Sequence, residues 1–108
     1  MIATKVDVLG TEYTIELKVL RDEDCDGFCD YTSKRIVIRS DNTNAVDDFE
    51  WLQKKQLRHE IVHAFLAESG LQCNFEHAQK FGHEETTVDW IAVQFPKLLR
   101  AFKEAGAL

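Results

Sequence analysis

Residues 57–70 read LRHEIVHAFLAESG, and this stretch decides how the rest of the chain is interpreted. Residues 61–67 are apolar except for His63, and a helix that is apolar almost all round packs inside a protein. No Gly or Pro interrupts residues 46–69, and Gly70 is the residue type that commonly follows the last turn of a helix. We therefore predict a buried helix over residues 46–69, with an N-cap among the polar residues just before it.

The residues before this helix alternate with a period of two. Residues 13–19 place Tyr, Ile, Leu and Val on one side and polar residues on the other, which is typical of a half-buried strand. Residues 4–9 form a second predicted strand, joined to the first by a tight turn at Gly10. Two more short strands are expected at residues 28–31 and 35–39. The sequence therefore predicts a small antiparallel sheet of three or four strands.

A second helix is predicted over residues 83–104, and Pro96 should kink or locally break it. The fold class is therefore α+β: a small sheet, then a buried helix, then a second helix. The chain has 108 residues, of which 44% are hydrophobic and 30% charged. This balance is typical of a globular protein, and the length suits a single domain over residues 1–108.

Charge and composition exclude several classes of function. Thirteen Lys and Arg against 19 Asp and Glu give a net charge of −6, and no basic stripe suggests generic nucleic-acid binding. No apolar run approaches the roughly 18 residues that a membrane span needs, and the start MIATKVDVLG resembles no signal peptide. The three cysteines are an odd number, which favours reduced thiols. We expect a cytoplasmic protein with no membrane partner, and its oligomeric state stays open.

His59, Glu60 and His63 form the pattern HExxH within the first predicted helix. Residues four apart on a helix stand one turn above each other, with Cβ atoms about 5–6 Å apart. Two imidazoles at that separation can both reach one Zn²⁺ at about 2.0–2.1 Å. Glu60 lies about 100° round the helix from His59 and shares its face, where a carboxylate can take a proton from a water molecule that the metal acidifies. The pattern therefore predicts a zinc site with Glu60 as the catalytic base.

The second predicted helix offers a third zinc ligand, because a catalytic zinc takes three protein ligands and keeps one position for water. Glu85 and Asp89 stand one turn apart there. At about 100° per residue both flank an apolar stripe that must pack on the core. The stripe consists of Val88, Ile91, Ala92, Phe95, Leu98, Leu99 and Phe102. We expect Glu85 to bind zinc and Asp89 to support a ligating histidine. Glu84 also faces the core and stays open as the alternative ligand, although only Glu85 has the aspartate partner.

The HExxH pattern followed by ETTVD at residues 85–89 resembles the gluzincin clan of zinc metallopeptidases. It is most similar to the minimal ImmA/IrrE-like and SprT-like proteins, which phages and mobile elements often encode. The resemblance covers roughly residues 27–99, including the order of sheet and helices and the phrase VDWIAVQFPKL. It implies that His59, His63 and Glu85 bind zinc, that Glu60 is the general base and that Asp89 supports a histidine.

The resemblance also implies a protein or peptide substrate held along an edge strand of the sheet, either residues 35–39 or residues 28–31. One feature differs from the larger gluzincins, which add a His or Tyr that stabilises the oxyanion. No His or Tyr follows Asp89. The remaining candidates for this role are Tyr13, Tyr31, His77 and His83, and none is placed by a motif.

Two alternatives to a zinc metallopeptidase stay open. Cys25, Cys29, Cys73 and His77 have spacings within the range of a structural zinc site. The same scaffold could also serve as a non-catalytic zinc-binding regulatory or interaction module. The first expectation remains a hydrolase that uses zinc to cleave a peptide bond, and the substrate and cleavage site are not readable from the sequence.

Overall fold

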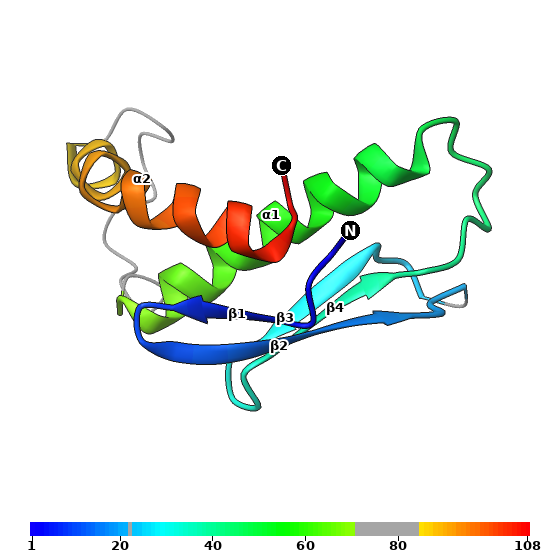
Figure 1. The fold of residues 1–108 in the computed structure, drawn as a ribbon, viewed down its shortest axis with the longest axis horizontal. Helices are drawn as coiled ribbons and strands as arrows, with labels where there is room; N and C mark the ends of the chain where they lie inside the picture. The colour runs from blue at the N-terminus through cyan, green and yellow to red at the C-terminus, as the bar shows by residue number, and fades with distance from the viewer. Residues whose placement is uncertain (22, 71–84) are drawn as a thin grey trace.

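The computed structural model describes residues 1–21, 23–70 and 85–108, and in α2 it leaves the side chains of residues 85, 86, 88, 89 and 92 undescribed. The elements are β1 (Lys5–Val8), β2 (Thr11–Lys18), β3 (Gly27–Asp30), β4 (Arg35–Arg39), α1 (Phe49–Glu68) and α2 (Glu85–Ala105). Figure 1 shows both helices on one side of the four-stranded sheet. The predicted α+β class, a small sheet followed by two helices, is confirmed.

The sheet has the strand order β1-β2-β4-β3, and it is mixed rather than antiparallel. β1 pairs antiparallel with β2, and β3 pairs antiparallel with β4, but β2 and β4 run parallel with Ile15 opposite Ile36. The prediction of an all-antiparallel sheet was therefore wrong for this central pair. After β2 the chain passes to the far edge, forms β3 there and turns back, so that β4 enters between β2 and β3.

Burial along β2 follows the predicted alternation only at its start. Tyr13 and Ile15 are buried in the core, whereas Leu17 and Val19 are exposed. The predicted tight turn before β2 is present, with positive φ at both Leu9 (52°) and Gly10 (91°). The apolar alternation therefore continues beyond the part of β2 that the core covers.

Helix α1 begins later than predicted and buries one face. The side chain of Asp48 caps it by accepting a hydrogen bond from the Trp51 backbone N–H. Gly70, at φ 85°, follows the C-cap Ser69 as expected. The buried face consists of Leu57, Glu60, Ile61, Ala64 and Phe65. His59 and His63 are exposed, so the prediction of a helix buried all round was wrong, because α1 packs on the sheet with one side only.

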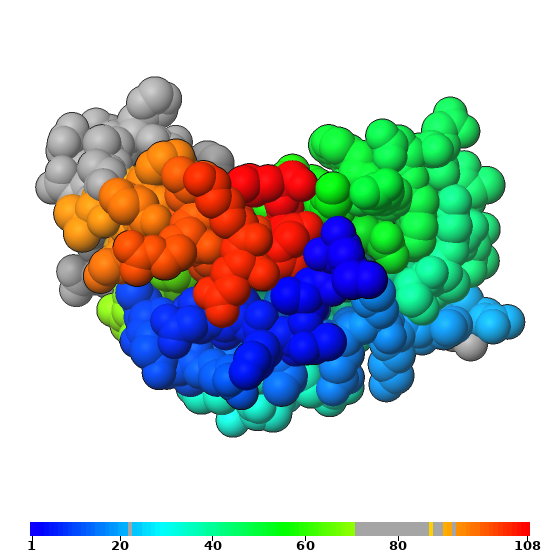
Figure 2. Space-filling view, viewed as in Figure 1, coloured from blue at the N-terminus to red at the C-terminus, as the bar shows by residue number. Residues whose placement is uncertain are grey.

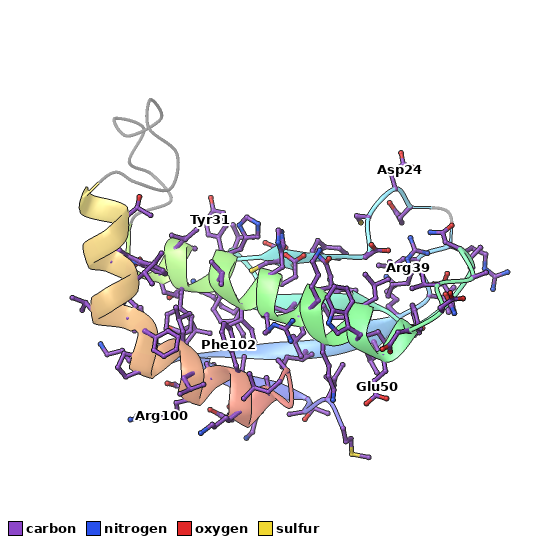
Figure 3. All side chains as sticks on the ribbon, turned by 90° about the horizontal axis from the view of Figure 1, so that it is seen from above. Asp24, Tyr31, Arg39, Glu50, Arg100 and Phe102 are labelled. Carbon is purple, nitrogen blue, oxygen red and sulfur yellow. The ribbon has the colours of Figure 1, made fainter. Side chains whose placement is uncertain are left out.

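Helix α2 runs through Pro96 as one element, and Figures 1 and 3 both show its axis changing direction along its length. The local break that was expected at Pro96 is therefore absent, and the helix bends as one continuous element. Leu98 is buried and Phe102 packs on the core. Ile91 and Phe95 are 50% and 54% exposed, so the predicted apolar stripe is wrong at these two positions, which precede the proline.

The two ends of the chain lie side by side, as Figure 2 shows for its blue and red atoms. The Ala3 backbone N–H donates to the Ala105 carbonyl at 3.0 Å, and the Arg58 guanidinium donates to the Ala107 carbonyl at 2.7 Å. These bonds join the end of α2 to both β1 and α1. No helix in the described part of the chain has the length and the apolar character that a membrane crossing requires.

Candidate metal centre

The two histidines of the HExxH pattern converge on one point beside α1. Their Nε2 atoms lie 3.1 Å apart, and their rings meet edge to face with centroids 4.7 Å apart. Two nitrogen ligands at about 2.0–2.1 Å from one tetrahedral ion are separated by about 3.3–3.4 Å. The imidazoles of His59 and His63 are thus close to the spacing of two ligands of a single zinc ion.

Glu60 lies between these histidines in sequence but on the buried side of the helix. It is 4% exposed, and one carboxylate oxygen lies within 4.8 Å of the histidine nitrogens. In the described part of the chain, His59, Glu60 and His63 are the one group of potential ligands that converges in this way. A carboxylate at this distance can bind the ion or exchange a proton with a water molecule on it.

A groove of about 830 Å³ runs past this group, between α1 and the edge strand β3. The helix contributes Gln56, His59, Glu60, His63 and Leu66, and the strand side contributes Cys25, Asp26, Gly27, Phe28, Cys29 and Tyr31. Figure 3 shows Tyr31 near the last turns of α1, with Asp24 toward the opposite end of the molecule. Of the two strands expected to hold a peptide, only residues 28–31 lie at an edge, because β4 is central.

Buried Arg39 holds the chain segment that leads into β3. Its guanidinium donates to the Glu23 carbonyl at 2.9 Å, to the Cys25 carbonyl at 2.7 Å and to Asp41 at 2.8 Å. Hydrogen bonds from Thr43, the Leu20 N–H and Arg39 keep the pKa of Asp41 below its usual range. One wall of the groove is therefore fixed by contacts to a buried cation, which the sequence analysis missed.

The third predicted ligand and its partner are placed only by their backbone. Glu85 is the first residue of α2, and Asp89 follows one turn later. Their side chains are outside the described part of the structure, as are Glu84 and His83 entirely. The structure therefore brings together His59, Glu60 and His63 and does not test Glu85, Glu84 or Asp89.

The predicted cysteine site is described only in half. Cys25 and Cys29 are free thiols, exposed and half-buried respectively, and Cys73 and His77 lie outside the described residues. Burial, together with the nearby Glu60 charge, raises the pKa of the Cys29 thiol to about 11. Both thiols line the same groove as the histidines.

Gln56 is a further site residue that the sequence analysis missed. Its side-chain amide donates to Glu60 Oε2 at 2.5 Å. Its position four residues before Glu60, one helical turn away, was the signal that could have found it.

Comparison of the chain with protein-family models, with curated proteins and with solved structures finds no match.

Proposed function

We propose that this protein is a zinc-dependent metallopeptidase that cleaves a peptide bond in a protein substrate. The observation that supports this most is the convergence of the His59 and His63 Nε2 atoms, 3.1 Å apart, beside the carboxylate of Glu60 in one groove. Two imidazoles and a carboxylate, here His59, His63 and the proposed third ligand Glu85, form the donor set of many catalytic zinc sites. This set suits zinc better than the all-oxygen sites that Ca²⁺ and Mg²⁺ prefer.

In this proposal His59 and His63 hold the ion, with Glu85 as the third ligand and Asp89 orienting a histidine. Bound zinc would acidify a water molecule and polarise the substrate carbonyl. Glu60 takes the proton of the attacking water at its carboxylate and delivers it to the nitrogen of the leaving amine. The burial of Glu60 supports this role, because the carboxylate is held inside the groove and away from bulk solvent.

An extended peptide is the substrate that the groove supports best. Within the described residues, strand β3 pairs with β4 on one side only, so its other edge offers backbone groups to an added strand. A peptide paired there would run along the groove wall opposite the histidines, with Phe28 and Tyr31 beside its side chains.

The decisive experiment compares the wild type with Glu60→Gln, using heat-denatured casein as the probe and elemental analysis for zinc. We expect both proteins to hold one zinc per chain and the variant to lose cleavage by about 100-fold or more. If both bind zinc and neither cleaves casein, the peptidase proposal fails and the non-catalytic zinc-binding module takes its place. His59→Ala serves as the matched control, because it should lose the metal as well as the activity.

A further inference from the structure

We infer that Gln56 is a positioning residue for Glu60: its amide holds the Glu60 carboxylate in the orientation that the proton transfer needs. This inference rests on the proposed peptidase function. Gln56 lies outside the HExxH pattern, and the contacts that support this role are made within α1 and with β3.

The side chains of Gln56 and Glu60 are in direct contact. The Gln56 Nε2 atom donates to Glu60 Oε2 at 2.5 Å, between residues one helical turn apart. Both side chains line the groove that also contains His59 and His63. The bond fixes one oxygen of the carboxylate, and a carboxylate is otherwise free to rotate about its last side-chain bond.

Gln56 lies in a confined space between α1 and β3. A Cβ atom at Gly27 would lie 3.2 Å from Gln56 Cγ and 2.6 Å from the Val37 carbonyl oxygen. Gly27 is not among the residues with positive φ, so its backbone does not require glycine. The missing side chain instead lets β3 approach α1 closely, with Gln56 in the space between them.

The donor that contacts Glu60 is a side-chain amide. The glutamine amide is neutral at every pH and has two N–H donors. It therefore orients the carboxylate without placing a charge beside it. An orienting neutral donor suits a group that must accept a proton and then release it.

The test uses the zinc-loaded protein and the variant Gln56→Met, which keeps the side-chain length and removes the donor. Gln53→Met is the matched control, because Gln53 is also in α1 and donates to the Arg39 carbonyl, away from the groove. Initial rates with fluorescein-labelled casein give kcat and KM, and thermal unfolding and elemental analysis accompany them. We expect Gln56→Met to lower kcat by about 10- to 100-fold, with KM, zinc content and Tm close to those of the wild type. Gln53→Met should keep the wild-type kcat.

A second measurement does not depend on activity. In the ¹H–¹⁵N spectrum, the Gln56 side-chain amide signals, identified by their loss in Gln56→Met, should shift in Glu60→Ala while those of Gln53 stay in place. Gln56 signals that do not shift in Glu60→Ala would show that the hydrogen bond is absent and would overturn the inference. If the wild type cleaves casein and Gln56→Met cleaves it equally well, Gln56 has no positioning role and the peptidase proposal stands. If the wild type does not cleave casein, both the peptidase proposal and the role of Gln56 fail.

Discussion

The Nε2 atoms of His59 and His63 lie 3.1 Å apart, although both side chains are exposed on α1. At this distance the two ring nitrogens can share a hydrogen bond, and both can reach one divalent ion. A divalent ion placed between them would be bound by both nitrogens. The geometry of the pair therefore makes metal content the first quantity to measure.

His63→Ala should reduce bound zinc from about one ion per chain to nearly none, because a zinc site that loses one of three ligands binds much more weakly. The matched variant replaces Cys25, Cys29 and Cys73 by serine and should keep its zinc. Elemental analysis of the purified proteins measures both. Zinc that stays in His63→Ala and disappears with the cysteines would instead assign the metal to the cysteine and histidine set at residues 25, 29, 73 and 77.

Arg39→Met should destabilise the fold strongly, because it removes a buried cation that bonds the carbonyls of Glu23 and Cys25 and leaves Asp41 without its ion-pair partner. The control is Arg35→Met, whose ion pair with Glu16 is partly exposed and contributes about 0–1 kcal/mol. Urea unfolding curves give both free energies. If Arg39→Met loses no more free energy of unfolding than Arg35→Met, the role of Arg39 in holding the groove wall is contradicted.

Glu68 should make stability depend on pH in the acidic range. Hydrogen bonds from Lys34 and Tyr13, both 2.8 Å long, lower the pKa of the Glu68 carboxyl below its usual 4.5. A lowered pKa stabilises the fold fully above the unfolded-state value, and the contribution is lost as the pH falls through the folded-state value. At pH 7 the free energy of unfolding of the wild type should therefore exceed that of Glu68→Gln by about 1 kcal/mol. This difference should shrink as the pH falls below about 4.5.

Urea unfolding at several pH values between 7 and 3 measures this difference. Glu12→Gln is the control, because Glu12 pairs with Lys5 at an exposed site, where such pairs contribute little. The difference in free energy of unfolding between wild type and Glu68→Gln could instead stay constant or grow on acidification. That result would show that the hydrogen bonds from Lys34 and Tyr13 do not stabilise the charged carboxylate.

Gly27→Ala should destabilise the protein by about 1–3 kcal/mol, the usual cost of forcing extra atoms into a packed site. Its Cβ would lie 2.6 Å from the Val37 carbonyl oxygen, so β3 would have to move away from β4 or α1. Gly10→Ala provides the comparison: nothing lies within 4 Å of a Cβ at that position, and only the positive φ of 91° is strained. Thermal unfolding should give Gly27→Ala a lower Tm than the wild type. If the Tm of Gly27→Ala equals that of the wild type, β3 is not closely packed at this position.

Local patterns predicted a large part of the fold. The period of two located the four strands, and Gly70 located the end of α1, because strand and helix geometry repeat over a few neighbouring residues. The same reasoning failed wherever a distant segment decided the outcome. Tyr13 and Leu17 have the same place in the alternation, yet only Tyr13 is buried, since burial depends on how far the core covers the sheet.

The sequence alone determined that His59 and His63 stand one turn apart with Glu60 beside them, because the backbone hydrogen bonds of a helix set that spacing. It also determined the α+β class. The parallel pairing of β4 with β2 depends on tertiary contacts. This pairing leaves β3 at the edge beside the histidines and creates the groove. Strand partners are chosen by contacts between residues far apart in the chain, and no local repeat carries that information.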